Sequence, residues 1–192
     1  MAFPSGLKTR RARDYARIFL GHNTSTWQIR FAGEVDVEMA KVVRTVGRCI
    51  IIRDGRLLLV EVDDGAGRWW CLPGGRQRFG ETIEECVRRE CHEELDCEVA
   101  VGRCLMVREL IGPRKCDPVG NVKDKHLLEL FFLGELKSEP KMTPRDKELV
   151  QIRWVDLSEL ETVNLYPRIL VDWIPSVPGT ADIKPIYIGD VD

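Results

Sequence analysis

The strongest structural signal in the chain is the stretch GGRQRFGETIEECVRRECHEELDC, residues 74–97, where a glycine break precedes an amphipathic segment. Thr82 stands at a helix N-cap position and Glu85 follows three residues later, which is the spacing of a capping box. Apolar side chains recur every four residues from Ile83 to Leu95. The spacing therefore predicts a helix to about Leu95 with one buried stripe.

The same segment concentrates carboxylates. Glu90, Glu93 and Glu94 fall within five positions, and residues three or four apart share one helix face. Unpartnered like charges at this spacing destabilise a helix by a few tenths of a kcal/mol each, in rough terms. One interpretation is a solvent-exposed face crossed by ion pairs, since Arg89 lies four residues after Glu85 and four before Glu93. The other is a positive ion held among the carboxylates.

The glycine break favours the second interpretation. Gly74 and Gly75 let the backbone turn tightly and expose carbonyl oxygens to a ligand. A hard divalent cation prefers oxygen ligands, namely carboxylates, backbone carbonyls and water. A glycine turn beside three glutamates supplies this set and leaves positions open for the phosphates of a substrate.

The remaining patterns predict one mixed sheet with helices packed against it, which is the α/β to α+β class. Residues 48–62 form two β-rich runs around Asp54-Gly55, a dipeptide suited to a type I′ hairpin. Further strands are expected at about 98–108, 126–136 and 149–157, and a short last one within 184–191. The segments 157–163 and 166–174 are expected to be closing helices.

Composition excludes several classes of protein. The net charge of −2 argues against binding of nucleic acid through bulk electrostatics. No apolar run approaches the roughly 20 residues that a membrane helix needs. The seven cysteines contain no CxxC pair, which argues against a structural zinc site and favours core residues in a reducing cytoplasm.

The segment from Gly75 to Cys97 resembles the signature of the Nudix hydrolases. That signature reads Gly, five residues, Glu, seven residues, Arg-Glu, an apolar residue, any residue, Glu-Glu, any residue, Gly and an apolar residue. The matching charged and glycine positions are Gly75, Glu81, Arg89, Glu90, Glu93 and Glu94. Asp96 replaces the usual second glycine, and aspartate tolerates the left-handed conformation expected there. The resemblance implies a Nudix-type mixed β-sheet sandwiched between helices.

The resemblance also implies a metal site. Glu90 and Glu94 would be the principal ligands of Mg²⁺ or Mn²⁺, and the carbonyl of Gly74 would complete the set. Glu93 would be either a further ligand or the general base. Such an ion neutralises the oxygens of a phosphoanhydride, which otherwise repel a nucleophile.

Other residues of the motif would support the catalytic carboxylates. Arg89 would orient the glutamates, Glu81 would brace the loop through that arginine, and Gly75 would complete the structural support. In this family the general base can also come from a loop outside the motif, and Glu148 stands in such a place. Glu148 read on its own is an exposed loop carboxylate, so both interpretations stay open.

The substrate implied by the resemblance is a small nucleoside diphosphate derivative. An ADP-ribose-like compound is favoured because Pro113, sixteen residues after Cys97, resembles the proline marker of ADP-ribose pyrophosphatases. Arg108, Arg114 and Trp70 are the expected substrate contacts. The alternatives are a (d)NTP pyrophosphohydrolase, or a non-catalytic Nudix-fold binding or regulatory module.

The 192 residues suit one domain with extensions. We expect a Nudix hydrolase domain at 41–175, a C-terminal extension with a short strand at 176–192, and an N-terminal extension of unknown role at 1–40. The first 31 residues hold six Lys or Arg and one acid, Asp14, which is typical of a packing arm or of a transit peptide. Completion of a homodimer by this arm is a further expectation, in a cytoplasmic protein.

Overall fold

The computed structural model describes residues 42–65, 67–114, 124–141, 148–177 and 185–191. The chain divides between Ala40 and Lys41 into two units, and all the described residues belong to the second. The expectations for the extension at 1–40 therefore lie outside the described residues, as does Cys116.

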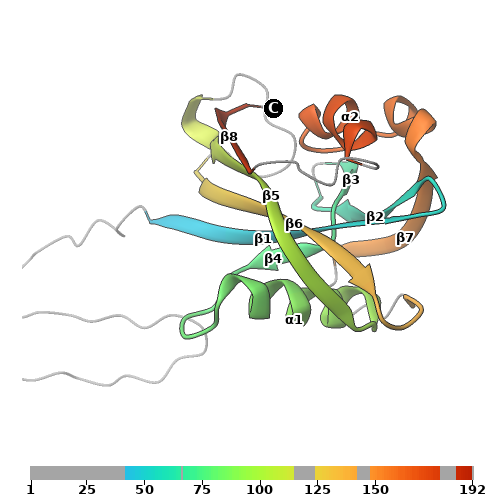
Figure 1. The fold of residues 1–192 in the computed structure, drawn as a ribbon. Helices are drawn as coiled ribbons and strands as arrows, with labels where there is room; N and C mark the ends of the chain where they lie inside the picture. Colours follow the sequence, from blue (N-terminus) through green and yellow to red (C-terminus); the bar gives the residue numbers. More distant parts are fainter. Residues whose placement is uncertain (1–41, 66, 115–123, 142–147, 178–184, 192) are drawn as a thin grey trace, which may run out of the picture. The chain divides into compact units, whose positions relative to one another are not determined.

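An eight-stranded mixed sheet forms the described unit (Figure 1). Its main path runs β3-β2-β1-β6-β5-β8, while β4 pairs with β1 and β7 pairs with β2. β1 and β6 are parallel, as are β5 and β8, and the other pairs are antiparallel. The strands are β1 (Val43–Arg53), β2 (Arg56–Asp63), β3 (Arg68–Cys71), β4 (Gly74–Arg76), β5 (Val99–Ile111), β6 (His126–Leu136), β7 (Leu149–Asp156) and β8 (Ile186–Asp190).

The hairpin between β1 and β2 turns at the predicted dipeptide. Asp54 has φ 51° and Gly55 has φ 72°, and two positive φ values at the centre of a two-residue loop are the requirement of a type I′ turn. The prediction from the sequence is confirmed.

Helix α1 (Ile83–Leu95) has the predicted capping box. The Thr82 hydroxyl accepts from the Glu85 N–H, and the Glu85 carboxylate accepts from the Thr82 N–H at 2.7 Å. The helix ends at Asp96, whose φ of 47° is left-handed, as expected of the residue that replaces glycine. Its buried positions are Cys86, Val87, Cys91 and Leu95, and Ile83 is half-buried.

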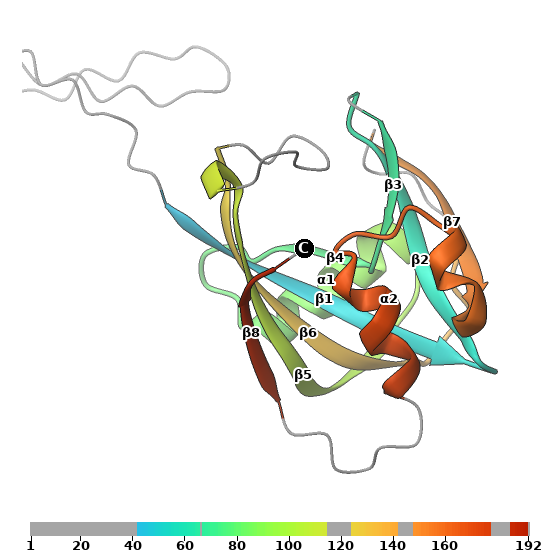
Figure 2. The same cartoon turned by 90° about the horizontal axis from the view of Figure 1, so that it is seen from above.

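The sheet separates two apolar cores, and α1 and α2 (Ile169–Trp173) lie on its opposite faces (Figure 2). On one face α1 covers a core that includes Cys49, Leu58 and Phe132. On the other face the chain after β7 covers a core that includes Ile50 and Phe131. The predicted mixed sheet between helices is confirmed.

The closing segments are less regular than the sequence predicts. Residues 157–163 were expected to be a helix, and the structure has a 3₁₀ helix, η2 (Leu157–Thr162). The second segment gives α2 (Ile169–Trp173), which is five residues long, followed by the 3₁₀ turn η3 (Ile174–Ser176). Pro167 and Pro175 flank α2, and proline lacks the N–H that a continuing helix needs. A third 3₁₀ turn, η1 (Gly112–Arg114), follows β5.

The described cysteines behave as core residues. Cys49, Cys71, Cys86, Cys91 and Cys97 are buried and Cys104 is half-buried, and all six are free thiols. Burial raises the pKa of Cys71 to about 12, so its thiol stays neutral at physiological pH.

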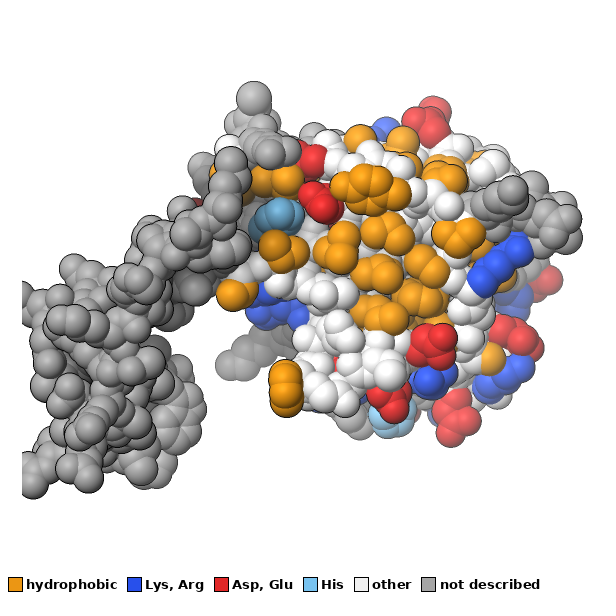
Figure 3. Space-filling view, turned by 60° about the vertical axis from the view of Figure 1, so that its left-hand side comes forward, with side chains coloured by type: hydrophobic (Ala, Val, Ile, Leu, Met, Phe, Trp, Pro, Cys, Tyr) orange, Lys and Arg blue, Asp and Glu red, His pale blue; other side chains and the backbone are white. Residues whose placement is uncertain are grey.

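The surface of the unit is mixed in character. Figure 3 shows hydrophobic side chains gathered on one face. Large apolar side chains that are exposed among the described residues are Val42, Val43, Phe79, Ile186 and Tyr187. Within the described part of the chain, no helix has the length and apolar character needed to cross a membrane.

Candidate active site

The glycine bend of β4 lies between β1 and α1, and both glycines are required there. Gly74 has φ +134°, and a Cβ at this position would lie 2.1 Å from the carbonyl oxygen of Gly47. A Cβ on Gly75 would lie 2.6 Å from the carboxyl carbon of Glu90. Since real atoms do not approach so closely, the absence of a side chain lets the Glu90 carboxylate lie directly against the backbone.

The three clustered glutamates are half-buried and each has a defined partner. Glu90 Oε1 accepts from Arg89 Nη1 at 2.5 Å. Glu94 Oε2 accepts from the backbone N–H of Gly74 at 2.9 Å. Glu93 accepts from Arg89 Nη1 and from Arg78 Nη2, at 3.2 Å in each case. Two carboxylates of α1, Glu90 and Glu94, therefore meet the glycine bend, as the sequence predicts.

Arg89 joins the loop to the helix. Its Nε and Nη2 donate to the two carboxylate oxygens of Glu81 at 3.0 and 2.7 Å, and Nη2 also donates to the carbonyl of Arg76 at 3.0 Å. The side-chain hydrogen bonds from Arg89, together with a backbone bond from Arg78, lower the pKa of Glu81 to about 2. This bidentate pair is the contact that the resemblance implies for Glu81.

The ion pair expected between Glu85 and Arg89 is replaced by a helix cap. Glu85 is spaced to pair with Arg89, but its carboxylate caps the helix by accepting from the Thr82 N–H. The exposed Arg88 pairs with Glu84 at 3.7 Å instead. The capping bond satisfies a backbone N–H that has no partner within the helix, which explains the preference.

The oxygen donors at the bend suit a hard divalent cation in chemical type. Glu90, Glu94 and the Gly74 carbonyl are carboxylate and carbonyl oxygens, the ligands that Mg²⁺ and Mn²⁺ prefer. Glycine at position 75 creates the space into which the Glu90 carboxylate fits. Among the described residues, no three His, Cys, Asp or Glu side chains are drawn together closely enough to hold a metal ion by themselves. Glu93 in particular is directed to two arginines.

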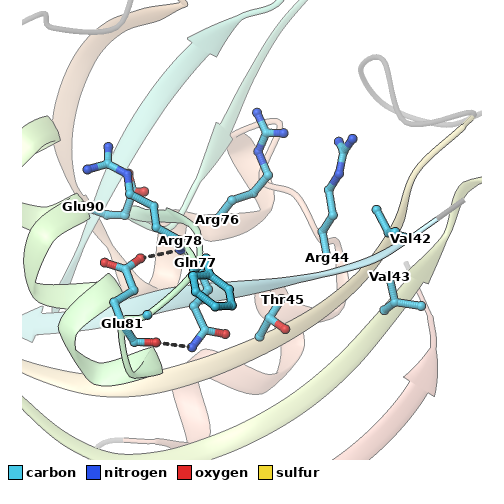
Figure 4. Close-up of a pocket in the computed structure, with 11 residues that line it drawn as sticks. Val42, Val43, Arg44, Thr45, Arg76, Gln77, Arg78, Glu81 and Glu90 are labelled. Atoms are coloured by element: carbon cyan, nitrogen blue, oxygen red, sulfur yellow. Dashed lines mark hydrogen bonds between the residues drawn. The ribbon is translucent and has the colours of Figure 1, made fainter. Parts of the chain in front are cut away.

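A pocket of about 1070 Å³ opens beside these carboxylates (Figure 4). Glu81 and Glu90 form part of its wall. Arg44, Arg76 and Arg78 also line it, and in the close-up Arg44 and Arg76 extend in the same direction. These three arginines are not among the site residues expected from the sequence. The run GGRQR at 74–78 was the available signal for two of them.

Glu148 and two of these arginines act on the same lysine, Lys125. Glu148 precedes β7, is exposed, and its carbonyl accepts from the Asp63 N–H at 2.8 Å. The pKa of Lys125 is lowered by burial and by the neighbouring charges of Arg76 and Arg44, whereas Glu148 opposes that shift. Lys125 is therefore an electrostatic neighbour of both arginines and of Glu148.

Two of the three expected substrate contacts are instead in the interior. Arg108 lies within β5 with 0% exposure, because the strand continues to Ile111 instead of ending at 108. Trp70 lies in β3 with 8% exposure and packs in the core opposite α1. Neither side chain forms a surface that could clamp a substrate. The side chain of Arg114 is outside the described residues.

Comparison with known proteins identifies relatives for most of the described unit. A family model described as the NUDIX domain matches residues 43–174. The curated protein "Phosphatase NudJ" of Escherichia coli strain K12 is 25% identical over 127 residues, which make up 66% of this chain and 77% of NudJ.

Solved structures share the fold at lower identity. An ADP-ribose pyrophosphatase from Streptococcus suis aligns with a TM-score of 0.59 and 18% identity, over 77% of this chain and 100% of its own. The MutT protein from Bacillus halodurans aligns with a TM-score of 0.57 and 22% identity, over 77% of this chain and 88% of its own. The family model covers well over half of the chain, so this protein belongs to the NUDIX domain family and is a Nudix hydrolase.

Proposed function

We propose that this enzyme hydrolyses the pyrophosphate bond of a nucleoside diphosphate derivative in a reaction that depends on Mg²⁺ or Mn²⁺, with an ADP-ribose-like substrate favoured. The observation that carries the proposal is the contact of Glu90 and Glu94 with the Gly74–Gly75 bend. Members of the family generally use divalent metal ions. The S. suis relative in structure is an ADP-ribose pyrophosphatase by name.

Each residue of the site has a proposed role. Glu90, Glu94 and the Gly74 carbonyl would hold the cation, which would neutralise phosphate oxygens and acidify a water molecule. Arg89 orients Glu90 and Glu93, because its Nη1 donates to both carboxylates. Glu81 fixes the guanidinium of Arg89 through two hydrogen bonds, and so holds the loop against the helix.

The general base has two candidates. Glu93 faces Arg78 and Arg89, and Glu148 is an electrostatic neighbour of Lys125. The base must accept a proton from the attacking water, so its replacement by glutamine should slow the chemical step more than replacement of the other carboxylate. Single-turnover rates of Glu93→Gln and Glu148→Gln separate the two.

A nucleoside triphosphate is the second candidate substrate. It is supported by Arg44, Arg76 and Arg78, three arginines that line the pocket together with Glu90. A triphosphate carries more negative charge than ADP-ribose and suits a more basic wall. A binding module without catalysis is the least supported function, because all the glutamates of the motif are present and two of them, Glu90 and Glu94, contact the bend.

The deciding experiment measures products with Mg²⁺ and with Mn²⁺. ADP-ribose should give AMP and ribose 5-phosphate, whereas a triphosphate should give a nucleoside monophosphate and pyrophosphate. Glu90→Gln should lower kcat by at least roughly a hundredfold without unfolding the chain, because the variant loses a charged ligand at the reacting phosphates. Glu84→Gln, at an exposed position of the same helix, is the matched control. Near-normal turnover by Glu90→Gln would refute the assignment.

A further inference from the structure

An arginine of β1, Arg48, contacts the glycine bend. Arg48 pairs with Gly74 in the register of β1 and β4. Its Nη1 donates to the carbonyl of Gly74 at 2.9 Å and to that of Leu72 at 3.3 Å, and its Nε donates to Glu129 Oε1 at 3.3 Å. One guanidinium group therefore links the Gly74 carbonyl of the bend, and the Leu72 carbonyl just before it, to a carboxylate of β6.

The two sides of Gly74 are held by different charged groups. Its N–H donates to Glu94 Oε2 at 2.9 Å, while its carbonyl accepts from Arg48. A glycine has no side chain through which packing could fix its backbone, and glycine backbones have the widest conformational freedom. The direction of the Gly74 carbonyl therefore depends on these hydrogen bonds and on the pairing with β1.

Glu129 holds Arg48 by a hydrogen bond to Nε, and the burial of its carboxylate costs free energy of folding. It is 2% exposed, and Arg108 Nε lies 3.5 Å from its Oε2. Arg108 is fully buried, its Nη2 donates to the Tyr166 hydroxyl at 2.9 Å, and its guanidinium lies 4.9 Å from the centre of the Tyr166 ring. Among the described residues, neither the buried Arg108 Nη1 nor the buried Glu129 Oε2 has a hydrogen-bond partner.

Such a network is a poor source of stability. Buried ion pairs often stabilise a fold no more than apolar residues of the same size would, and buried polar atoms without partners are costly. A role for the network beyond stability accounts for its presence at this position, where it touches the bend that carries the metal-binding oxygen of the proposed function.

We propose that Arg48 is a positioning residue that fixes the direction of the Gly74 carbonyl toward the divalent cation, and that Glu129 holds Arg48 in place for this purpose. A carbonyl oxygen has two lone pairs, so the bond from Arg48 leaves one for the ion. The inference rests on the proposed function, because that function makes the Gly74 carbonyl a ligand.

The test uses Arg48→Lys, which keeps the positive charge and removes the fork that spans two carbonyls and Glu129. Because the charge is unchanged, any effect reports geometry. In the metal-free protein, hydrogen exchange at the Gly74 amide should become roughly tenfold faster, as for loss of one hydrogen bond from a charged donor. Binding of Mn²⁺ alone, followed by electron paramagnetic resonance, should weaken by about tenfold, and kcat should fall more than KM changes.

Two control variants separate positioning from general damage. Arg53→Lys changes an arginine of the same strand whose exposed partner is Glu139, at 2.6 Å, and it should leave both quantities as in the wild type. Arg108→Lys alters the other arginine on Glu129 without touching Gly74, so it should lower the unfolding temperature and leave Gly74 exchange near wild type.

The inference is overturned if Arg48→Lys folds and matches Arg53→Lys in Gly74 exchange and in Mn²⁺ affinity. If Arg48→Lys does not fold, Glu129→Asp decides, since it keeps the charge but withdraws the carboxylate by one methylene. Glu129→Asp should speed Gly74 exchange and weaken Mn²⁺ binding, each by less than Arg48→Lys would. If Glu129→Asp changes neither quantity, the inference is overturned. Absence of Mn²⁺ binding by the wild type would refute the proposed function, while Gly74 exchange would still decide whether Arg48 fixes the bend.

Discussion

At the scale of single residues, Glu81 shows how one carboxylate joins the loop to the helix. Both its oxygens accept from Arg89, and Oε1 also accepts from the Arg78 N–H at 2.6 Å. These bonds favour the ionised carboxylate and lower its pKa from 4.5 to about 2. The pair therefore contributes stability that depends on pH.

The pH dependence has a definite sign. A lowered pKa in the folded state gives stability that is complete above about pH 4.5 and is lost as the pH falls toward about 2. Glu81→Gln should remove this component, so the two proteins should differ in unfolding temperature at pH 6 and converge near pH 2. Glu161→Gln, an exposed carboxylate of η2, should keep the wild-type profile. A constant difference between Glu81→Gln and wild type across this range would contradict the prediction.

At the scale of elements, the end of α1 is a place where the chain departs from its family pattern. Asp96 adopts φ 47° and ψ 38°, and its N–H donates to the His92 carbonyl at 3.2 Å. A left-handed conformation is strained for residues with a Cβ, and aspartate tolerates it better than most. The helix keeps its cap at a small cost in stability.

Asp96→Gly should therefore stabilise the protein by up to about 1 kcal/mol, because glycine removes the strain. Asp96→Ala should destabilise it by about the same amount, since alanine has the Cβ but not the tolerance of aspartate. The free energy of unfolding in urea measures both, and Asp96→Asn should stay near wild type. Equal stabilities of the glycine and alanine variants would exclude this explanation.

Local patterns predicted the elements that carry their own signals. The turn at Asp54-Gly55, the capping box at Thr82 and the strand at 126–136 all formed as expected. The second closing segment was shorter than expected, because Pro167 and Pro175 flank α2 and lack the N–H groups that a longer helix needs. The carboxylates next to the glycine bend were predictable, since one helix and one loop contain them all.

At the scale of the whole molecule, the sequence could not predict contacts that depend on the order of strands. Arg48, Arg108 and Glu129 meet because β1, β6 and β5 are neighbours in a particular register. Arg108 is an expected substrate contact from the sequence, yet it faces the buried carboxylate of Glu129 on the next strand. Likewise Arg44 joins Arg76 beside the pocket only through the pairing of β4 with β1.

The edge of the sheet gives a prediction at the same scale. β8 covers β5 in parallel from Met106 to Glu109, and Asp190 accepts from the Ile111 N–H at 3.0 Å. Removal of residues 185–192 should expose backbone groups of β5 that can pair with another chain, so the shortened protein should self-associate. Light scattering after size-exclusion chromatography measures this, and removal of Asp192 alone is the control. If the shortened chain elutes with the molar mass of the same oligomeric state as the full chain, this role of β8 is contradicted.

The final strand has a practical consequence for anyone who handles the protein. β8 ends at Asp190 and pairs with β5, so a purification handle or fluorescent fusion joined shortly after it would crowd the strand that shields β5. A flexible spacer after residue 192 would keep the fused group away from β8.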